Sequence, residues 1–194
     1  PKSSMKVVLA RPGHEIILAN FYAVNEAYFR KWSPAVTRGH HSVESWKRML
    51  AVREIDFEHR VSAPLIGTDE TESYVIGACS LSNIVRGIFQ DCHMGYSVAK
   101  RYEGSGNMKR IVIHAIDYAF NDFKLHRIMA NHMPGNERSA RLLKSLGFEQ
   151  EGYTRGYLLF NGKCEDPLLH SCRLSTPPSP RALSPSPMPA SASQ

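Results

Sequence analysis

RYEGSG, residues 101–106, separates two stretches of different hydrophobic periodicity. Residues 91–99, DCHMGYSVA, precede it and are apolar and β-branched enough to indicate a strand. Residues 107–123, NMKRIVIHAIDYAFNDF, follow it and carry apolar side chains at intervals of three and four, which predicts a helix. A strand, a glycine-containing loop and a helix N-terminus together offer free N–H groups and a positive helix dipole to an anion. The segment therefore predicts an anion-binding turn inside a fold of mixed strands and helices.

Three patterns of phosphate-binding loop were compared with this turn. The Walker loop needs Lys after its last glycine, but Gly106 is followed by Asn107. The dinucleotide fingerprint needs a third glycine where the chain has Lys109. The pattern Arg/Gln-x-x-Gly-x-Gly/Ala is met in full by Arg101, Gly104 and Gly106, whose glycines let backbone N–H groups approach a pyrophosphate. Taken alone, the same residues also describe a turn that only starts a helix.

Outward from this loop, the sequence alternates between strand-like and helix-like stretches. The expected strands are residues 6–12, 58–67, 73–85, 91–99 and 126–133, followed by one or two hairpin strands within 148–174. The expected helices are residues 14–30, 43–53, 107–123 and 136–147, with Ser42 and Asn136 as N-cap residues. The order β-α-α-β-β-β-α-β-α-β-β favours an α+β or mixed α/β fold.

The composition changes sharply after Leu174. Residues 175–194, STPPSPRALSPSPMPASASQ, hold half of the 12 prolines and almost no large apolar side chain. Such a segment buries too little surface to offset its ordering entropy, so we expect a disordered Pro/Ser-rich tail. It is either a docking tail or a dispensable extension. Residues 1–174 are expected to form a single domain, in keeping with a chain of 194 residues.

Charge and cysteine content limit the class of protein further. The net charge of +6 favours a phosphate-bearing ligand or an acidic surface, although the basic residues are scattered. The four cysteines form no C-x-x-C pair, so we expect reduced thiols, no disulfide frame and no metal site. The sequence has no apolar run of 18 residues, and residues 1–13 lack an apolar h-region, so we do not expect them to be a secretory signal. A cytoplasmic protein is expected.

Four stretches together resemble the GNAT acetyltransferases. They are SNIVRG (82–87), MGYSVAKRYEGSG (94–106), HRIMANHMPGNERSARLLKSLGFEQEGY (126–153) and YLLFNGKCED (157–166). The resemblance covers residues from about 6 to 172 and is nearest to the bacterial enzymes that acetylate the N-terminal alanine of a small-subunit ribosomal protein. It implies an acetyltransferase domain over residues 1–174. The implied fold has a central, mostly antiparallel, splayed sheet of six to seven strands, flanked by about four helices.

The resemblance also implies a binding site for acetyl-CoA. The strand ending Tyr96-Ser97-Val98 would pair its free backbone edge with the pantetheine arm, and Asn136 would hold the same chain. Lys100 would add charge beside the diphosphate. The residues implied around the diphosphate are Arg101, Tyr102, Glu103, Gly104, Ser105, Gly106 and Asn107.

The implied reaction is attack of an amine on the thioester carbonyl through a tetrahedral oxyanion. It needs a neutral amine, a donor for the oxyanion and a proton for the sulfur. Backbone N–H groups near Gly95 to Ser97 could serve the oxyanion. Many similar enzymes have a Glu two residues before the Gly-Tyr dipeptide, where this chain has His93. His93 is therefore a candidate base, the alternative being a structural histidine. Ser139 in the N-x-R-S segment is a candidate acid, and Tyr153 and Tyr157 are lesser ones.

The acceptor is implied by the resemblance alone. The leading hypothesis is the α-amine of the N-terminal alanine of a ribosomal protein on the small subunit. An α-amine with a pKa of about 7.7 to 8.0 needs only a modest base, whereas a lysine at about 10.4 needs a strong one. The alternatives are a small amine, such as a polyamine or drug, and a non-enzymatic ribosome- or RNA-binding module.

Three further expectations concern assembly and individual side chains. We expect a monomer or weak dimer. His40 and His41 are expected to be solvated. Phe29, Trp32 and Trp46 are expected in the core or a groove wall.

Overall fold

The structure is a computed structural model that describes residues 4–34, 36–37, 39–156, 158–160 and 163–174. The predicted disordered tail, residues 175–194, lies outside the described residues, as does Tyr157. Within the described part, no helix is long and apolar enough to cross a membrane.

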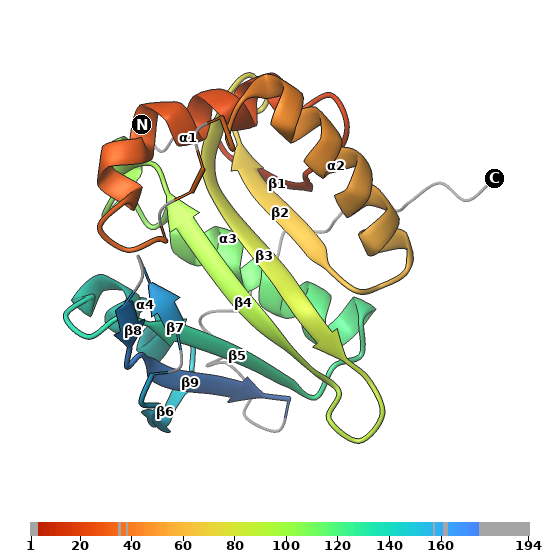
Figure 1. Cartoon of the computed structure of the whole chain (residues 1–194). Coiled ribbons are helices and arrows are strands. Elements are labelled where there is room, and N and C mark those ends of the chain that lie inside the picture. The colour runs from red at the N-terminus through yellow and green to blue at the C-terminus, as the bar shows by residue number, and fades with distance from the viewer. Residues whose placement is uncertain (1–3, 35, 38, 157, 161–162, 175–194) are drawn as a thin grey trace.

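A seven-stranded sheet in the order β1-β2-β3-β4-β5-β9-β6 forms the centre of the molecule, and β7 and β8 form a separate hairpin (Figure 1). The strands are β1 (Lys6–Leu9), β2 (Ala63–Thr68), β3 (Val75–Val85), β4 (Asp91–Val98), β5 (Arg127–His132), β6 (Glu149–Tyr153), β7 (Leu158–Phe160), β8 (Lys163–Glu165) and β9 (Leu168–Arg173). The helices are α1 (Glu15–Phe29), α2 (Val43–Glu58), α3 (Asn107–Asp117) and α4 (Glu137–Ser145). A 3-10 turn, η1 (Lys100–Tyr102), precedes α3, and a π turn, η2 (Tyr118–Asp122), follows it. The predicted mixed, mostly antiparallel fold is confirmed.

One strand pair departs from the antiparallel pattern. β4 and β5 are parallel, and their register runs only from Asp91↔Arg127 to Met94↔Ala130. Beyond Met94 the two strands diverge, as Figure 1 shows for the green β4 and the teal β5. The second half of β4 keeps its pairing with β3, from Ser80↔Gly95 to Gly77↔Val98. The sheet is therefore split in its middle, with one edge of β4 open.

Helices cover both faces of the first half of the sheet. α1 and α2 pack on one face, where Leu18, Trp46 and Leu50 bury against Ile66 and Val75. α3 covers the opposite face, and passes behind β3 and β4 in Figure 1. Its approach is close, because a Cβ added at Gly67 or Gly77 would lie 2.5 or 2.9 Å from the Ile111 side chain. Glycine at these two strand positions lets α3 pack closely against β2 and β3.

Two predicted boundaries were wrong. Residues 58–61 do not open a strand, because α2 continues to Glu58 and the chain then turns at Arg60, whose φ is +58°. Residues 148–174 contain four strands rather than one or two, since β6 and β9 join the main sheet while β7 and β8 pair only with each other. The predicted caps are confirmed: Ser42 accepts from the Ser45 N–H at 3.2 Å and Asn136 from the Ser139 N–H at 3.2 Å.

The cysteines that the structure describes with side chains are buried and unpaired. They are Cys79, Cys92 and Cys172. Burial raises the pKa of Cys92 to about 12, so this thiol stays protonated at physiological pH. Within the described residues, no three His, Cys, Asp or Glu side chains converge in the manner of a metal site.

Candidate functional site

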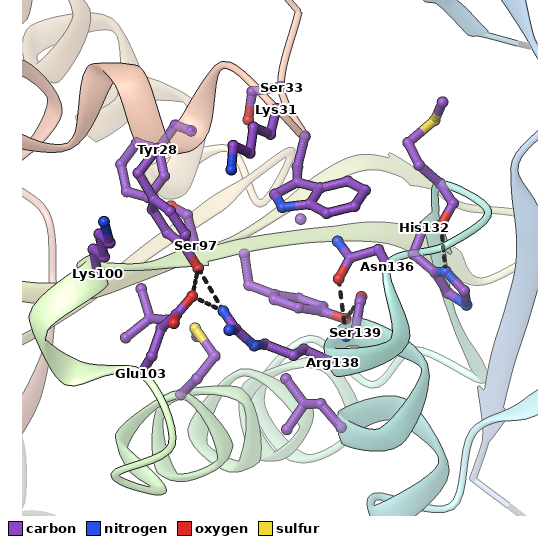
Figure 2. A pocket seen from close by; sticks show the side chains of 18 of the residues that line it. Tyr28, Lys31, Ser33, Ser97, Lys100, Glu103, His132, Asn136, Arg138 and Ser139 are labelled. Atoms are coloured by element: carbon purple, nitrogen blue, oxygen red, sulfur yellow. Dashed lines mark hydrogen bonds and ion pairs between the residues drawn. The ribbon is translucent and has the colours of Figure 1, made fainter.

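A cleft of about 1380 Å³ opens where β4 and β5 diverge (Figure 2). Its walls come from α1 and the loop after it, the second half of β4, the 100–106 loop, the start of α3, the end of β5 and the start of α4. The predicted residues that line it are Tyr96, Ser97, Val98, Tyr102, Glu103, Gly104, Gly106, Asn136 and Ser139. The fold therefore brings together most of the residues that the sequence suggested for a cosubstrate.

The glycine loop presents its backbone to this cleft. Gly104 and Gly106 have φ values of +69° and +81°, which side-chain-bearing residues adopt only with strain. Gly106 is the N-cap of α3 and brings no side chain to the helix start. The Asn107 N–H donates to Ser105 Oγ at 3.4 Å, and the amides that follow it in the first turn of α3 remain available to an anion. Ser105 is used within the loop itself, since its hydroxyl donates to the Tyr102 carbonyl at 2.5 Å.

Arg101 occupies a different place from the one predicted. Its guanidinium lies 5.0 Å from the centre of the Tyr74 ring and 4.7 Å from that of Tyr102. The two rings are parallel to within 6°. Arg101, Ser105 and Asn107 are not among the described residues that line the cleft, whereas Lys100 and Lys109 are. Basic charge at this cleft thus comes from other side chains, namely Lys31, Lys100, Lys109, Arg138 and Arg141.

Three side chains form a bridge across the cleft. The Glu103 carboxylate accepts a hydrogen bond from the Tyr28 hydroxyl and forms an ion pair with Arg138. Arg138 also donates to the Tyr28 hydroxyl at 3.3 Å. Figure 2 shows these contacts as dashed lines that connect α1, the glycine loop and α4. The bridge ties together three elements that are far apart in the sequence.

The open edge of β4 carries unpaired backbone groups. The Ala99 N–H donates to the Ile76 carbonyl on the β3 side at 2.9 Å. Because successive residues of a strand direct their N–H groups to opposite sides, Tyr96 and Val98 direct theirs toward the β5 side. β5 has already diverged there. This edge can therefore extend the sheet with a ligand that carries its own amides.

Two hydroxyls meet at the centre of the cleft. The Tyr96 phenol oxygen lies 2.5 Å from Ser139 Oγ. Ser139 is held in the first turn of α4, where its own N–H donates to Asn136. Burial raises the pKa of Tyr96 to about 12, an effect that the hydrogen bond from Ser139 partly opposes. The phenol therefore keeps its proton across the physiological range and can act as a donor.

A second, smaller cleft of about 520 Å³ lies on the side of α1 and β3. The residues that line both clefts are Phe29, Ser33, Pro34, Gly95, Tyr96 and Ser97. Small hydroxyl side chains of β3, Ser80 and Ser82, line the smaller cleft alone, as do Tyr22, Glu26 and His41. The two clefts therefore meet at residues 95–97, next to the open edge of β4.

Comparisons with known proteins agree with this geometry. The family model described as acetyltransferase (GNAT) domain matches residues 10–149. The [ribosomal protein uS5]-alanine N-acetyltransferase of Escherichia coli (strain K12) is 39% identical over 161 residues, 82% of this chain and 81% of that protein. This chain belongs to the GNAT acetyltransferases. As a GNAT enzyme it is an acetyl-CoA-dependent N-acetyltransferase.

Solved structures show the same GNAT fold. The ribosomal-protein-S5-alanine acetyltransferase from Vibrio fischeri matches with a TM-score of 0.84 and 35% identity, over 90% of this chain and 96% of that one. Mycobacterium smegmatis RimJ in complex with CoA-disulfide matches with a TM-score of 0.83 over 94% of this chain and 88% of that one. Its 22% identity supports the fold alone.

The structure does not bring the predicted GNAT base to the reaction point. His93 lines neither cleft among the described residues, and its Nδ1 lies 3.2 Å from the Asn83 amide nitrogen. His93 pairs with Ser82 of β3 and lies two residues before Gly95, where the two clefts begin to meet. Tyr153 is 56% exposed at the sheet edge. The assignment of His93 stays a prediction that this geometry does not favour.

Several site residues of this GNAT enzyme were missed or misplaced by the sequence. Arg138 lies inside the N-x-R-S segment, but its pairing with Glu103 depends on how α4 faces the glycine loop. Of the two histidines predicted to be solvated, His40 is exposed, whereas His41 is half-buried because its ring stacks on Tyr22. Trp46 is core at 1% exposure, as expected, and Phe29 and Trp32 line the larger cleft.

Proposed function

We propose that this protein transfers the acetyl group of acetyl-CoA to the α-amine of an N-terminal alanine on a ribosomal protein of the small subunit, in the cytoplasm. The acceptor comes from the relatives in Escherichia coli and Vibrio fischeri, whose names state this activity. The meeting of two clefts at residues 95–97 carries the structural side of the proposal. A reaction between two bound molecules requires such a junction.

The larger cleft fits acetyl-CoA. In the proposal, the Val98 N–H donates to an amide carbonyl of the pantetheine arm along the open edge of β4. The diphosphate lies against the uncapped start of α3 and the glycine loop, with the Lys100 and Lys109 side chains close by. Anion binding at a helix N-terminus of this kind is common in proteins. The Glu103–Arg138 bridge would then cross the channel that the arm occupies.

The thioester supplies an activated acyl group, and the protein residues position the acceptor and move protons. The Tyr96 N–H, which faces the open edge of β4, stabilises negative charge on the carbonyl oxygen as the amine attacks. Tyr96 keeps its proton because of its raised pKa and donates toward the departing sulfur. Ser139, on the buried face of α4, lies 2.5 Å from this phenol and shares a hydrogen bond with it. The pair thus serves as the acid of the reaction.

The smaller cleft is suited to an extended peptide end. Its floor carries Ser80, Ser82 and Ser97, whose hydroxyls both donate and accept hydrogen bonds. A small side chain such as that of alanine fits a cavity of about 520 Å³ together with the next residues of the peptide. The α-amine then reaches residues 95–97 from the side opposite to the thioester.

Mass spectrometry of peptide acetylation tests this proposal. The protein is incubated with acetyl-CoA and a ten-residue peptide beginning with alanine, copied from the N-terminus of the small-subunit protein uS5. The expected product gains one acetyl group on the α-amine, and the same peptide with a blocked N-terminus but a free internal lysine gains none. Acetylation of spermidine at a higher kcat/KM than the peptide, or of the lysine alone, would overturn the assignment of the acceptor.

A further inference from the structure

His41 lies in the wall of the smaller cleft, just before the Ser42 cap of α2. Its ring stacks on that of Tyr22, with centroids 4.2 Å apart and planes 5° apart. On the same side the Trp46 ring lies 5.9 Å away at 18°. Trp46 is fully buried, so this stack ties the imidazole to the core. A loop histidine is thus held in one orientation at the edge of the acceptor cleft.

One nitrogen of this ring makes no hydrogen bond within the described residues. His41 Nδ1 is buried and has no hydrogen-bond partner among the described residues. Leaving a buried polar atom unpaired costs about 1–3 kcal/mol. Folded proteins keep few such atoms, and each is explained by strain, by an ordered water or ion, or by a role in function. The residue itself lines the smaller cleft, so a molecule bound there lies against its ring.

The charges around His41 favour its neutral form. Burial is the largest cause that lowers its pKa, and the neighbouring His40 lowers it further. Arg53 of α2 also lowers it, while Glu26 of α1 opposes the shift. Arg30 lines the same cavity from the end of α1. The net direction is downward, so the imidazole is unprotonated at the pH where a GNAT enzyme works and can accept a proton.

We propose that His41 is the general base that takes a proton from the acceptor ammonium in the smaller cleft. This inference rests on the proposed function. The ammonium gives one proton to the imidazole, directly or through one water. The neutral amine then forms the C–N bond, the C–S bond breaks, and a second amine proton passes to the sulfur through the Tyr96–Ser139 pair. The imidazolium returns its proton to solvent, and the products are the amide, the free thiol and one released proton.

His41 has two features that His93 lacks. It lines the cavity that opens at residues 95–97, and its Nδ1 is unpartnered among the described residues. His93 lines neither cleft and has its Nδ1 near the Asn83 amide. The sequence placed the base on β4, whereas the structure offers one from the segment that joins α1 and α2.

The experiment measures kcat/KM for the Ala-peptide from pH 6 to 9 in the wild type and four variants. His41→Gln removes the imidazole, and His41→Phe removes it while keeping an aromatic ring in the stack. His40→Gln and His93→Gln are the matched controls. Each variant is first shown to fold by its melting curve and to bind coenzyme A by calorimetry.

Both His41 variants are expected to lose about 100-fold at pH 7, the usual contribution of a general base. The loss is expected to shrink toward pH 9, where the α-amine is already mostly neutral. The two controls should stay within threefold of the wild type. A folded His41 variant within threefold of wild type at pH 7, or one with the same loss at every pH, would overturn the assignment. If the wild type itself leaves the peptide unmodified, the proposed function fails instead.

Discussion

The Tyr96 hydroxyl of β4 and the Ser139 hydroxyl of α4 lie 2.5 Å apart, across the split in the sheet. The two residues are 43 positions apart in the chain and belong to opposite walls of the larger cleft. Each is fixed independently, Tyr96 by the β3–β4 ladder and Ser139 by the cap of α4. The hydrogen bond therefore forms only when β4 and α4 are correctly placed relative to each other.

Removing either hydroxyl should slow the chemical step. Tyr96→Phe and Ser139→Ala are each expected to lower kcat about 100-fold, because both interrupt one path of protons to the sulfur. The KM for acetyl-CoA should change little. The double variant should be little worse than either single one, as for residues that act as a unit. Steady-state kinetics with the Ala-peptide measure this, and Ser145→Ala on the exposed face of α4 is the control. Losses that multiply would argue against a shared path.

The glycine loop should be sensitive to a single methyl group. In Gly106→Ala the φ of +81° costs about 1–2 kcal/mol, and the Cβ stands where an anion would approach the start of α3. Gly147→Ala carries the same φ of +81° at the end of α4. Both variants should melt a few degrees lower, at about 2–4 °C per kcal/mol. Only Gly106→Ala should raise the Kd for coenzyme A, by tenfold or more in calorimetry. Equal Kd values for the two variants would place the diphosphate elsewhere.

The two basic residues on either side of the loop should behave differently. Lys109→Ala is expected to raise the KM for acetyl-CoA about tenfold, because a charge-assisted hydrogen bond contributes about 1.5 kcal/mol. Arg101→Ala should change that KM less than twofold and lower the melting temperature, since its guanidinium stacks on two tyrosine rings. The reverse order of effects would restore the phosphate-binding role that the sequence suggested for Arg101.

Acid should weaken the anchoring of the N-terminal segment. Lys6 first, and His14 second, hold the pKa of Glu72 at about 2, below its ordinary value of 4.5. The carboxylate therefore contributes stability that is complete above pH 4.5 and is lost as the pH falls toward 2. Glu72→Gln should melt below the wild type at pH 7, and the difference should narrow by pH 3. Glu54→Gln on the exposed face of α2 is the control. A difference that stays constant with pH would mean that the charge of Glu72 is not what matters.

Local patterns were sufficient to predict much of the fold. The three-and-four spacing in residues 107–123 predicted α3, and side-chain capping predicted where α2 and α4 begin. The strands of residues 148–174 were undercounted, because β6 gains its place only by pairing with β9. Such pairing depends on contacts that no short window of sequence contains.

The site was predictable where backbone conformation decides it. Glycine at positions 104 and 106 indicates a backbone conformation with positive φ, which both residues adopt. Most of the predicted cosubstrate residues line the larger cleft. Side chains whose role depends on a distant partner were not predictable. Arg101 points to Tyr74 rather than into the cleft, and His41 is oriented by Tyr22. In both cases an aromatic ring from another element decides where the side chain lies.

The divergence of β4 from β5 after Met94 also affects how the two halves of the sheet open locally. Among the described residues, the β4–β5 ladder joins the β1–β4 half to the β5–β9–β6 half by four register pairs. The two halves are thus expected to open as separate units in hydrogen–deuterium exchange, with the amides of Tyr96 and Val98 among the fast ones of β4. A bound pantetheine arm would lie along the open edge of β4 and fill the gap between the two halves. Slowed exchange at these two amides, together with a raised melting temperature, would then report cosubstrate binding without any turnover.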